Sequence, residues 1–331
     1  MDLAQAWAGE PNRNGRGLLV PQRIRPLAGP VGLPSQERGT EMRLFVLFLA
    51  LAAALSAKTA LVVAADQTDW VLAAGGTIAT LAADGVEVHL LRVGNDEKDS
   101  WDLSPEETAS RARKENEAAA KILGVKEVHS LGYRSGELGG VEHTELRDRI
   151  LFFIRKYKPE ILFLPNPYAE YVEVLDRFYV GKAAEDAWRS GPLENVQPAF
   201  ASAGLKGHVV DEVYYYAQPV DPRRREPEST ATFVPQPKVL DIAGALDKKI
   251  RAAQALETAN ESMAQRIKQR LDETGRRLPL LDEVNRQSVN ELVAINVREL
   301  ARIAAEASKY EQAEEFHYAG IEFQIPSKYL Q

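Results

Sequence analysis

Two aspartates, Asp66 and Asp69, stand where an α/β protein places its chemistry. They follow the apolar run Thr59–Ala65, which predicts a strand buried on both faces. They precede Gly75-Gly76, which predicts a tight turn that opens a helix. Because ligands of α/β sheets bind outside the carboxyl ends of the strands, we treat residues 66–69, the acidic elbow, as a candidate ligand site. The alternative is that the two carboxylates cap the following helix.

The composition excludes several other kinds of site. The 331 residues include no cysteine, so disulfides, thiolate metal sites and cysteine nucleophiles are absent. No two of the five histidines are spaced i, i+4, so the sequence predicts no histidine-rich metal motif. They are His89, His129, His143, His208 and His317. The net charge of -7 argues against a nucleic-acid partner, which needs a basic face.

Strand and helix signals alternate between residues 59 and 217, the pattern of a parallel sheet with helices on both faces. We therefore expect an α/β fold, a Rossmann-like three-layer sandwich with a mostly parallel sheet. Ser104-Pro105 marks one helix start and Gly124 its end. The predicted strands are 59–65, 86–93, 127–131, 161–165 and 209–218. The predicted helices are 77–83, 105–123, 144–157 and 178–189.

The C-terminal part reads as a helical extension packed on this body. After a short strand at 238–242, apolar periodicity predicts two long helices, 244–274 and 289–308, covering one face of the sheet. The aromatic-rich segment Phe316–Tyr329 is expected to dock on the body as a tail. The expected domains are therefore an α/β domain at 59–243 and a C-terminal extension at 244–331.

The N-terminal 58 residues carry an export pattern. Residues 1–41 are polar without apolar periodicity and are expected to be disordered or an upstream extension. Residues 42–58 combine one positive charge, an apolar run and a small-residue end, as a signal peptide starting at Met42 does. The apolar run is too short for a membrane span, which needs about twenty residues. We expect an exported protein without a stable membrane span; the alternative is a buried helix or an uncleaved anchor.

Six segments form a recognisable series in order and spacing: Leu61-Val-Val-Ala64, Ala74-Gly-Gly-Thr-Ile-Ala79, Gly85-Val-Glu-Val-His-Leu-Leu91, Glu115–Val125, Leu131–Leu138 and Lys158–Pro165. This series resembles the LmbE/PIG-L family of metal-dependent N-acetylglucosamine deacetylases. The resemblance covers roughly residues 59–265 and implies that family's fold.

The chain departs from the family at the first metal motif, Pro-His-Pro-Asp-Asp-Glu. In the family its His and second Asp bind zinc, and its first Asp is the general base. Here the aligned residues run from Ala65 to Trp70. Asp69 therefore keeps a ligand position, Asp66 occupies the histidine position, and Thr68 occupies the general-base position, leaving the catalytic residue unknown.

The second motif, His-Pro-Asp-His, is also altered. It aligns with Val174-Leu175-Asp176-Arg177, so Arg177 stands where the family has its third zinc ligand. A family Asp in the intervening loop corresponds to Ser135. The resemblance thus implies Asp69, Asp66 and Asp176 as candidate metal ligands, and Trp70, Ser135 and Arg177 as candidate substrate-binding residues.

Two outcomes for the metal follow from these replacements. Zinc is the family's cofactor and prefers nitrogen and sulfur ligands, whereas an oxygen-only set would suit Mg²⁺, Mn²⁺ or Ca²⁺. Alternatively, Arg177 pairs with Asp66 or Asp69, and its guanidinium fills the metal's space so that no metal binds.

Two functions remain open on the sequence. The first is an N-deacetylase that hydrolyses the N-acetyl group of an amino sugar or related conjugate with an altered metal site. The second is a non-catalytic carbohydrate-binding or scaffold protein on the same fold. Either reading implies an amino-sugar-like small-molecule ligand, and neither fixes whether the chain forms a homo-oligomer.

Overall fold

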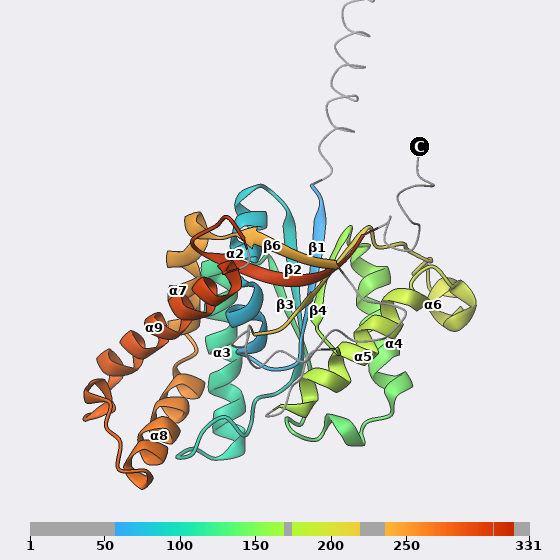
Figure 1. Ribbon diagram of the computed structural model, residues 1–331. Coiled ribbons are helices and arrows are strands. Elements are labelled where there is room, and N and C mark those ends of the chain that lie inside the picture. Colours follow the sequence, from blue (N-terminus) through green and yellow to red (C-terminus); the bar gives the residue numbers. More distant parts are fainter. Residues whose placement is uncertain (1–56, 169–173, 219–235, 307, 321–331) are drawn as a thin grey trace, which may run out of the picture. The chain divides into compact units, whose positions relative to one another are not determined.

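A seven-stranded sheet forms the centre of the computed structural model, which describes residues 57–168, 174–218, 236–306 and 308–320 (Figure 1). The strand order is β3-β2-β1-β4-β5-β7-β6. The first five strands are parallel, and β7 runs antiparallel to both of its neighbours. The strands are β1 (Thr59–Ala64), β2 (Glu87–Gly94), β3 (Glu127–Tyr133), β4 (Ile161–Pro165), β5 (Glu212–Tyr216), β6 (Gln236–Asp241) and β7 (Ala313–Gly320).

Helices cover both faces of the sheet, as the alternating pattern predicted (Figure 1). On one face α2 (Asp69–Ala83), α3 (Pro105–Leu123), α7 (Leu246–Gln254) and α9 (Arg286–Ala305) share a core with the sheet. On the other face α4 (His143–Tyr157) and α5 (Leu175–Ser190) do the same. The fold is therefore the predicted α/β sandwich with a mostly parallel sheet.

Local sequence signals explain the helix ends. The Ser104 side chain accepts a hydrogen bond from the Glu107 N–H at 3.2 Å, Pro105 opens α3, and Gly124 closes it with a φ of 89°. That left-handed conformation favours glycine, which has no Cβ to clash. The apolar face predicted for α4 is also present, because Leu146, Ile150, Leu151 and Ile154 are all buried.

Helix α2 begins at Asp69, six residues before the glycine pair that was expected to open it. The glycines lie inside the helix, where they permit close packing. A Cβ on Gly76 would lie 2.8 Å from the Ile242 side chain. The Gly76 and Thr77 N–H groups donate to the buried Glu314 carboxylate at 2.8 and 2.7 Å. The glycine pair therefore serves contact with the C-terminal part of the chain rather than a turn.

The C-terminal part differs from the expectation in two places. The predicted helix over 244–274 is two helices, α7 and α8 (Glu257–Glu273), separated at Ala255-Leu256. The expected docking tail begins as strand β7, which lies between β5 and β6. Buried Lys249 of α7 pairs with Glu314 of β7 at 2.8 Å, so these elements are also joined by charge.

Residues 1–41 and most of the expected signal peptide at 42–58 lie outside the described residues. Among the helices that are described, none combines the length and apolar composition required to cross a membrane. A short helix, α6 (Pro198–Ser202), was not predicted.

Candidate functional site

The strand order places the acidic elbow at a switch point of the sheet. Strands β2 and β3 lie on one side of β1, and β4 and β5 lie on the other, so the loops after β1 and β4 diverge there. This crevice is the usual ligand site of open α/β sheets. The elbow follows β1, and α5, which carries Arg177, follows β4.

Asp66 organises the start of α2. Its Oδ1 accepts hydrogen bonds from the Thr68 N–H at 2.9 Å, the Thr68 hydroxyl at 2.8 Å and the Asp69 N–H at 2.9 Å. The two N–H groups lie at the N-terminus of α2, where backbone N–H groups have no partner within the helix. The capping alternative considered from the sequence therefore holds for Asp66, once the helix is placed at Asp69 rather than near Gly75.

Arg177 forms a two-point ion pair with the same carboxylate, as one of the two sequence interpretations predicted. Its Nε donates to Asp66 Oδ2 at 2.6 Å, and its Nη2 donates to Asp66 Oδ1 and to the Thr68 hydroxyl, both at 3.1 Å. Gly181 allows α5 to approach this end of β4, because a Cβ there would lie 2.5 Å from the Pro165 carbonyl oxygen. That close approach brings Arg177 over the elbow.

The ion pair changes the protonation of the elbow. Burial alone would raise the pKa of Asp66, but the charge and hydrogen bonds of Arg177 hold it below its ordinary value. Burial and the neighbouring charge of Asp66 raise the pKa of Asp69 to about 7. The elbow therefore holds one carboxylate with a lowered pKa, Asp66, and one carboxyl group with a pKa of about 7, Asp69.

Asp69 is fully engaged by the protein around it. Its Oδ2 lies 2.9 Å from the Ala65 nitrogen and 3.1 Å from the Tyr216 hydroxyl, and its Oδ1 lies 2.5 Å from the Trp70 nitrogen. The residue is 2% exposed. Both carboxyl oxygens thus have partners, and neither faces open space in the way that a free metal ligand would.

A second acidic loop adjoins the elbow and was missed from the sequence. Asp96 and Asp99 follow β2 and are linked to buried Gln67: its N–H donates to Asp96 at 3.1 Å, and its side-chain amide donates to Asp99 at 2.7 Å. Arg92 pairs with Asp96 from β2. Burial raises the pKa of Asp96 well above its ordinary value and that of Asp99 to about 6. The available signal was their place directly after the second strand, since parallel strands end at the same edge.

Asp176 and Ser135, two further candidates, accept hydrogen bonds from backbone N–H groups. Asp176 accepts hydrogen bonds from the Gly136 and Leu138 N–H groups at 2.5 and 3.2 Å. The Ser135 hydroxyl accepts the Asp96 N–H at 2.8 Å, so it supports the second acidic loop.

Trp70 was expected to bind substrate but is 0% exposed in the core, with its indole N–H donated to Asn116 at 3.2 Å. It therefore presents no face on which a sugar could stack.

The side chains of the elbow do not fit the family's zinc. The ligand atoms of Asp66, Asp69 and Asp176 do not lie together within ligand distance of one ion. In the described part of the chain, the one group of three histidine or acidic side chains that do is His89, Glu127 and His129, elsewhere on the sheet. At the elbow a guanidinium holds Asp66, and backbone and tyrosine donors occupy Asp69. The structure therefore does not bring together the oxygen-only ligand set considered from the sequence.

Exposed aromatic rings mark the same end of the sheet. Trp101 follows β2, Tyr168 follows β4, and Phe178 lies in the first turn of α5; they are 51%, 44% and 40% exposed. Unlike Trp70, these residues present ring surface to solvent.

Comparison with known proteins identifies relatives of this domain. Residues 61–188 match the family model described as PIG-L: GlcNAc-PI de-N-acetylase. Over 161 residues, or 48% of this chain, it is 31% identical to the diacetylchitobiose deacetylase of Thermococcus kodakarensis. The match spans only 60% of the length of that relative.

Solved structures share the fold. The N,N'-diacetylchitobiose deacetylase from Pyrococcus horikoshii, in complex with its inhibitor, has a TM-score of 0.62 at 22% identity and covers 91% of this chain and 98% of its own. The 4-carboxy-2-hydroxymuconate hydratase from Pseudomonas putida has a TM-score of 0.54 at 20% identity, covering 80% and 96%. The second name is that of a hydratase, so the shared fold alone does not specify the reaction.

Proposed function

We propose that this chain, in which residues 61–188 form a PIG-L/LmbE family domain, binds an N-acetylated amino sugar or related conjugate without hydrolysing it by the family's metal-dependent route. The observation that carries the proposal is the two-point ion pair between Arg177 and Asp66 at the switch point of the sheet. It places a cation where the resemblance puts a metal ligand.

The chemistry of metal-dependent amide hydrolysis explains why this exchange is decisive. A hydrolytic zinc needs three protein ligands and an open position for water, and a nearby carboxylate must take the water's proton. The general-base position holds Thr68, whose hydroxyl donates to Asp66 and accepts from Arg177. A hydroxyl does not act as a base near neutral pH. The elbow thus lacks the family's ligand set and has a threonine at the family's general-base position.

The same groups can still recognise an acetamido group. Arg177 uses Nε and Nη2 on the elbow, while its Nη1 donates to no atom of the described residues. That N–H group suits an amide carbonyl oxygen, which is an acceptor. Exposed Trp101 and Tyr168 offer apolar ring faces for the sugar.

The ligand class rests on the relatives. The family description names a de-N-acetylase of a GlcNAc conjugate, and the curated relative is a diacetylchitobiose deacetylase. N-acetylglucosamine and N,N'-diacetylchitobiose are therefore the first ligands to test.

Hydrolysis without a metal is a second candidate, because one observation favours it. Asp69 has a pKa raised to about 7 by burial and by the charge of Asp66, and a general base works best with a pKa near the operating pH. Its three hydrogen-bond partners weigh against this role, so we place it second.

Acetate release and ligand binding, measured side by side, separate the two candidates. Calorimetry with N,N'-diacetylchitobiose should detect binding to the wild type that weakens at least tenfold in Arg177→Met or Trp101→Ala. Arg302→Met is the matched control, since Arg302 lies on α9, is 52% exposed and pairs with Glu299. Acetate release should stay at the buffer rate with and without added Zn²⁺.

Two results would overturn the proposal. Turnover that requires Zn²⁺ would show a working metal site, and metal-free turnover that Asp69→Asn abolishes would establish the second candidate. If the protein neither binds nor hydrolyses N-acetylglucosamine or N,N'-diacetylchitobiose, the proposed ligand class is wrong.

We also propose that the chain is exported through residues 42–58. Expression of the full chain, followed by N-terminal sequencing of the exported product, should give a mature start near Lys58. An intact N-terminus retained inside the cell would contradict export.

A further inference from the structure

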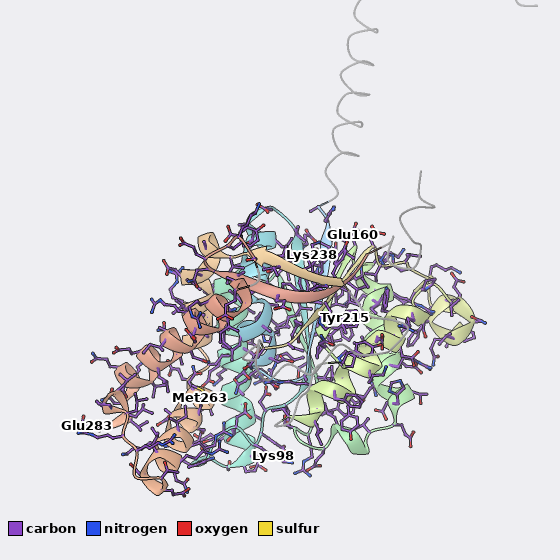
Figure 2. All side chains as sticks on the ribbon, in the orientation of Figure 1. Lys98, Glu160, Tyr215, Lys238, Met263 and Glu283 are labelled. Carbon is purple, nitrogen blue, oxygen red and sulfur yellow. The ribbon has the colours of Figure 1, made fainter. Side chains whose placement is uncertain are left out.

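A histidine–glutamate–histidine cluster lies at the opposite end of the sheet from the elbow. Its members are His89 on β2 and Glu127 and His129 on β3. Glu127 opens β3, at the amino ends of the parallel strands, whereas the elbow follows the carboxyl end of β1. Along β2, the five residue-to-residue steps from His89 to Gly94 span about 17 Å. Figure 2 shows these two ends: Lys98 follows β2 at one end, and Glu160 precedes β4 at the other.

Strand pairing brings the three side chains together. His89 is the register partner of Glu127, and Leu91 is the partner of His129. Since alternate residues of a strand face the same side, Glu127 and His129 point to one face of the sheet, together with His89. The spacing of the histidines along the sequence does not reveal this cluster, and no histidine-rich metal motif was predicted from it.

The distances within the cluster suit a metal ion. Glu127 Oε2 lies 3.6 Å from His89 Nδ1 and 3.4 Å from His129 Nε2. Ligands about 2.1 Å from a tetrahedral zinc are about 3.4 Å from one another. All three ligand atoms lie within 4.8 Å of each other, so closure on an ion needs only small side-chain movements.

One ligand atom is unsatisfied in the structure. His89 is 4% exposed, and its Nδ1 is buried without a hydrogen-bond partner. Buried polar atoms almost always have a partner, so an exception needs an explanation. A bound cation would provide it. The glutamate side chain is 50% exposed, which leaves a route for an ion from solvent.

Tyr157 of α4 closes the other side of the cluster. Its ring stacks on His89 with centroids 3.9 Å apart. Its hydroxyl donates to Glu127 Oε2 at 2.6 Å and lies 2.5 Å from His129 Nε2. Because the hydroxyl gives its one proton to the glutamate, it accepts from His129. A bound ion would replace the Tyr157 hydroxyl as the partner of His129 Nε2. The hydroxyl can keep its hydrogen bond to Glu127 and so orient that carboxylate.

We propose that His89 Nδ1, Glu127 Oε2 and His129 Nε2 form a binding site for a zinc-class divalent ion. Two imidazoles and one carboxylate are a ligand set that such ions take. The ion ties β2 to β3, which is the edge strand of the sheet, and so acts on stability rather than at the elbow. This site is independent of the proposed sugar-binding function.

Zinc and cobalt titrations of the chelator-treated full chain test the proposal. The wild type should bind one Zn²⁺ and, with Co²⁺, show the visible absorption of a tetrahedral nitrogen–oxygen site. Affinity should fall at least tenfold in Glu127→Gln and in His129→Gln, whose side chains are partly exposed. His143→Gln is the matched control: it removes an exposed histidine, 3.1 Å from Asp186, and should bind as the wild type does.

Tyr157→Phe keeps the ring and removes the competing hydroxyl, so it should still bind zinc. Circular dichroism checks that each variant is folded, and zinc should raise the melting temperature of the wild type but not of His129→Gln.

The proposal is overturned if the wild type binds no zinc. It is equally overturned if Glu127→Gln and His129→Gln bind zinc as the wild type does. Zinc lost in Asp69→Asn but kept in His129→Gln would place the ion at the elbow, contradicting the proposed function as well.

Discussion

Breaking the elbow's ion pair from one side should cost far more stability than a surface ion pair does. The pair joins Arg177 Nε to Asp66 Oδ2 at 2.6 Å, across 111 residues of sequence. Both side chains are mostly buried, at 13% and 15% exposure. The variants are Arg177→Met, Asp66→Asn and the two combined.

The magnitude follows from burial and from the other partners of Asp66. Removing one member of a buried pair costs about 3–5 kcal/mol, because the other charge is left buried and unpaired. Three further hydrogen bonds hold Asp66, so we expect the lower end, about 3 kcal/mol, for Arg177→Met. In the double variant neither charge remains, and the coupling energy should be about 2 kcal/mol.

Urea denaturation at pH 7 of the four proteins measures this coupling. The control is the surface pair Lys98–Glu137, joined at 2.9 Å but with side chains 48% and 46% exposed. Its own cycle, with Lys98→Met and Glu137→Gln, should give less than about 1 kcal/mol. If the losses in unfolding free energy at Arg177 and Asp66 simply add, with no more coupling than in the control, the two side chains do not form a strong buried ion pair. That result would refute this prediction.

Three further predictions concern the elements that hold the elbow. Gly76→Ala should destabilise by at least about 1 kcal/mol in urea, because the added Cβ would lie 2.8 Å from Ile242; Gly75→Ala, where contact would begin at 3.4 Å, should be neutral or stabilising. Asp69 has a folded pKa of about 7 against an ordinary value of 3.8, so the folded state binds the proton more tightly and stability falls as pH rises between these values. Asp69→Asn should flatten that fall between pH 5 and pH 7, and an unchanged slope would contradict the assigned pKa. Glu314→Gln should lower the melting temperature sharply, because it leaves the buried ammonium group of Lys249 without its carboxylate partner. A change as small as that of a surface variant would show that Lys249 is hydrated in the variant and does not depend on Glu314.

Much of the fold was predictable because its signals are local. The strand β4 is a short, fully apolar run, and α3 carries its N-cap serine, its proline and its C-terminal glycine in sequence. The ion pair was also foreseen, although its partners are 111 residues apart, because the resemblance placed both at one site.

Most of the failures depend on partners that are distant in sequence. The glycine pair was expected to open α2, but it lies inside the helix, where Gly76 packs against Ile242 and binds Glu314. Strand β7 reads as a tail until its pairing with β5 and β6 is known. The histidine cluster arises only from the register of β2 against β3.

Anomalous diffraction at the zinc edge, from crystals grown with zinc, tests the central claim most directly because it separates the two ends of the sheet. The account predicts no zinc peak at the elbow, with Arg177 still on Asp66. A zinc peak beside Asp66 and Asp69, with Arg177 turned away, would contradict it.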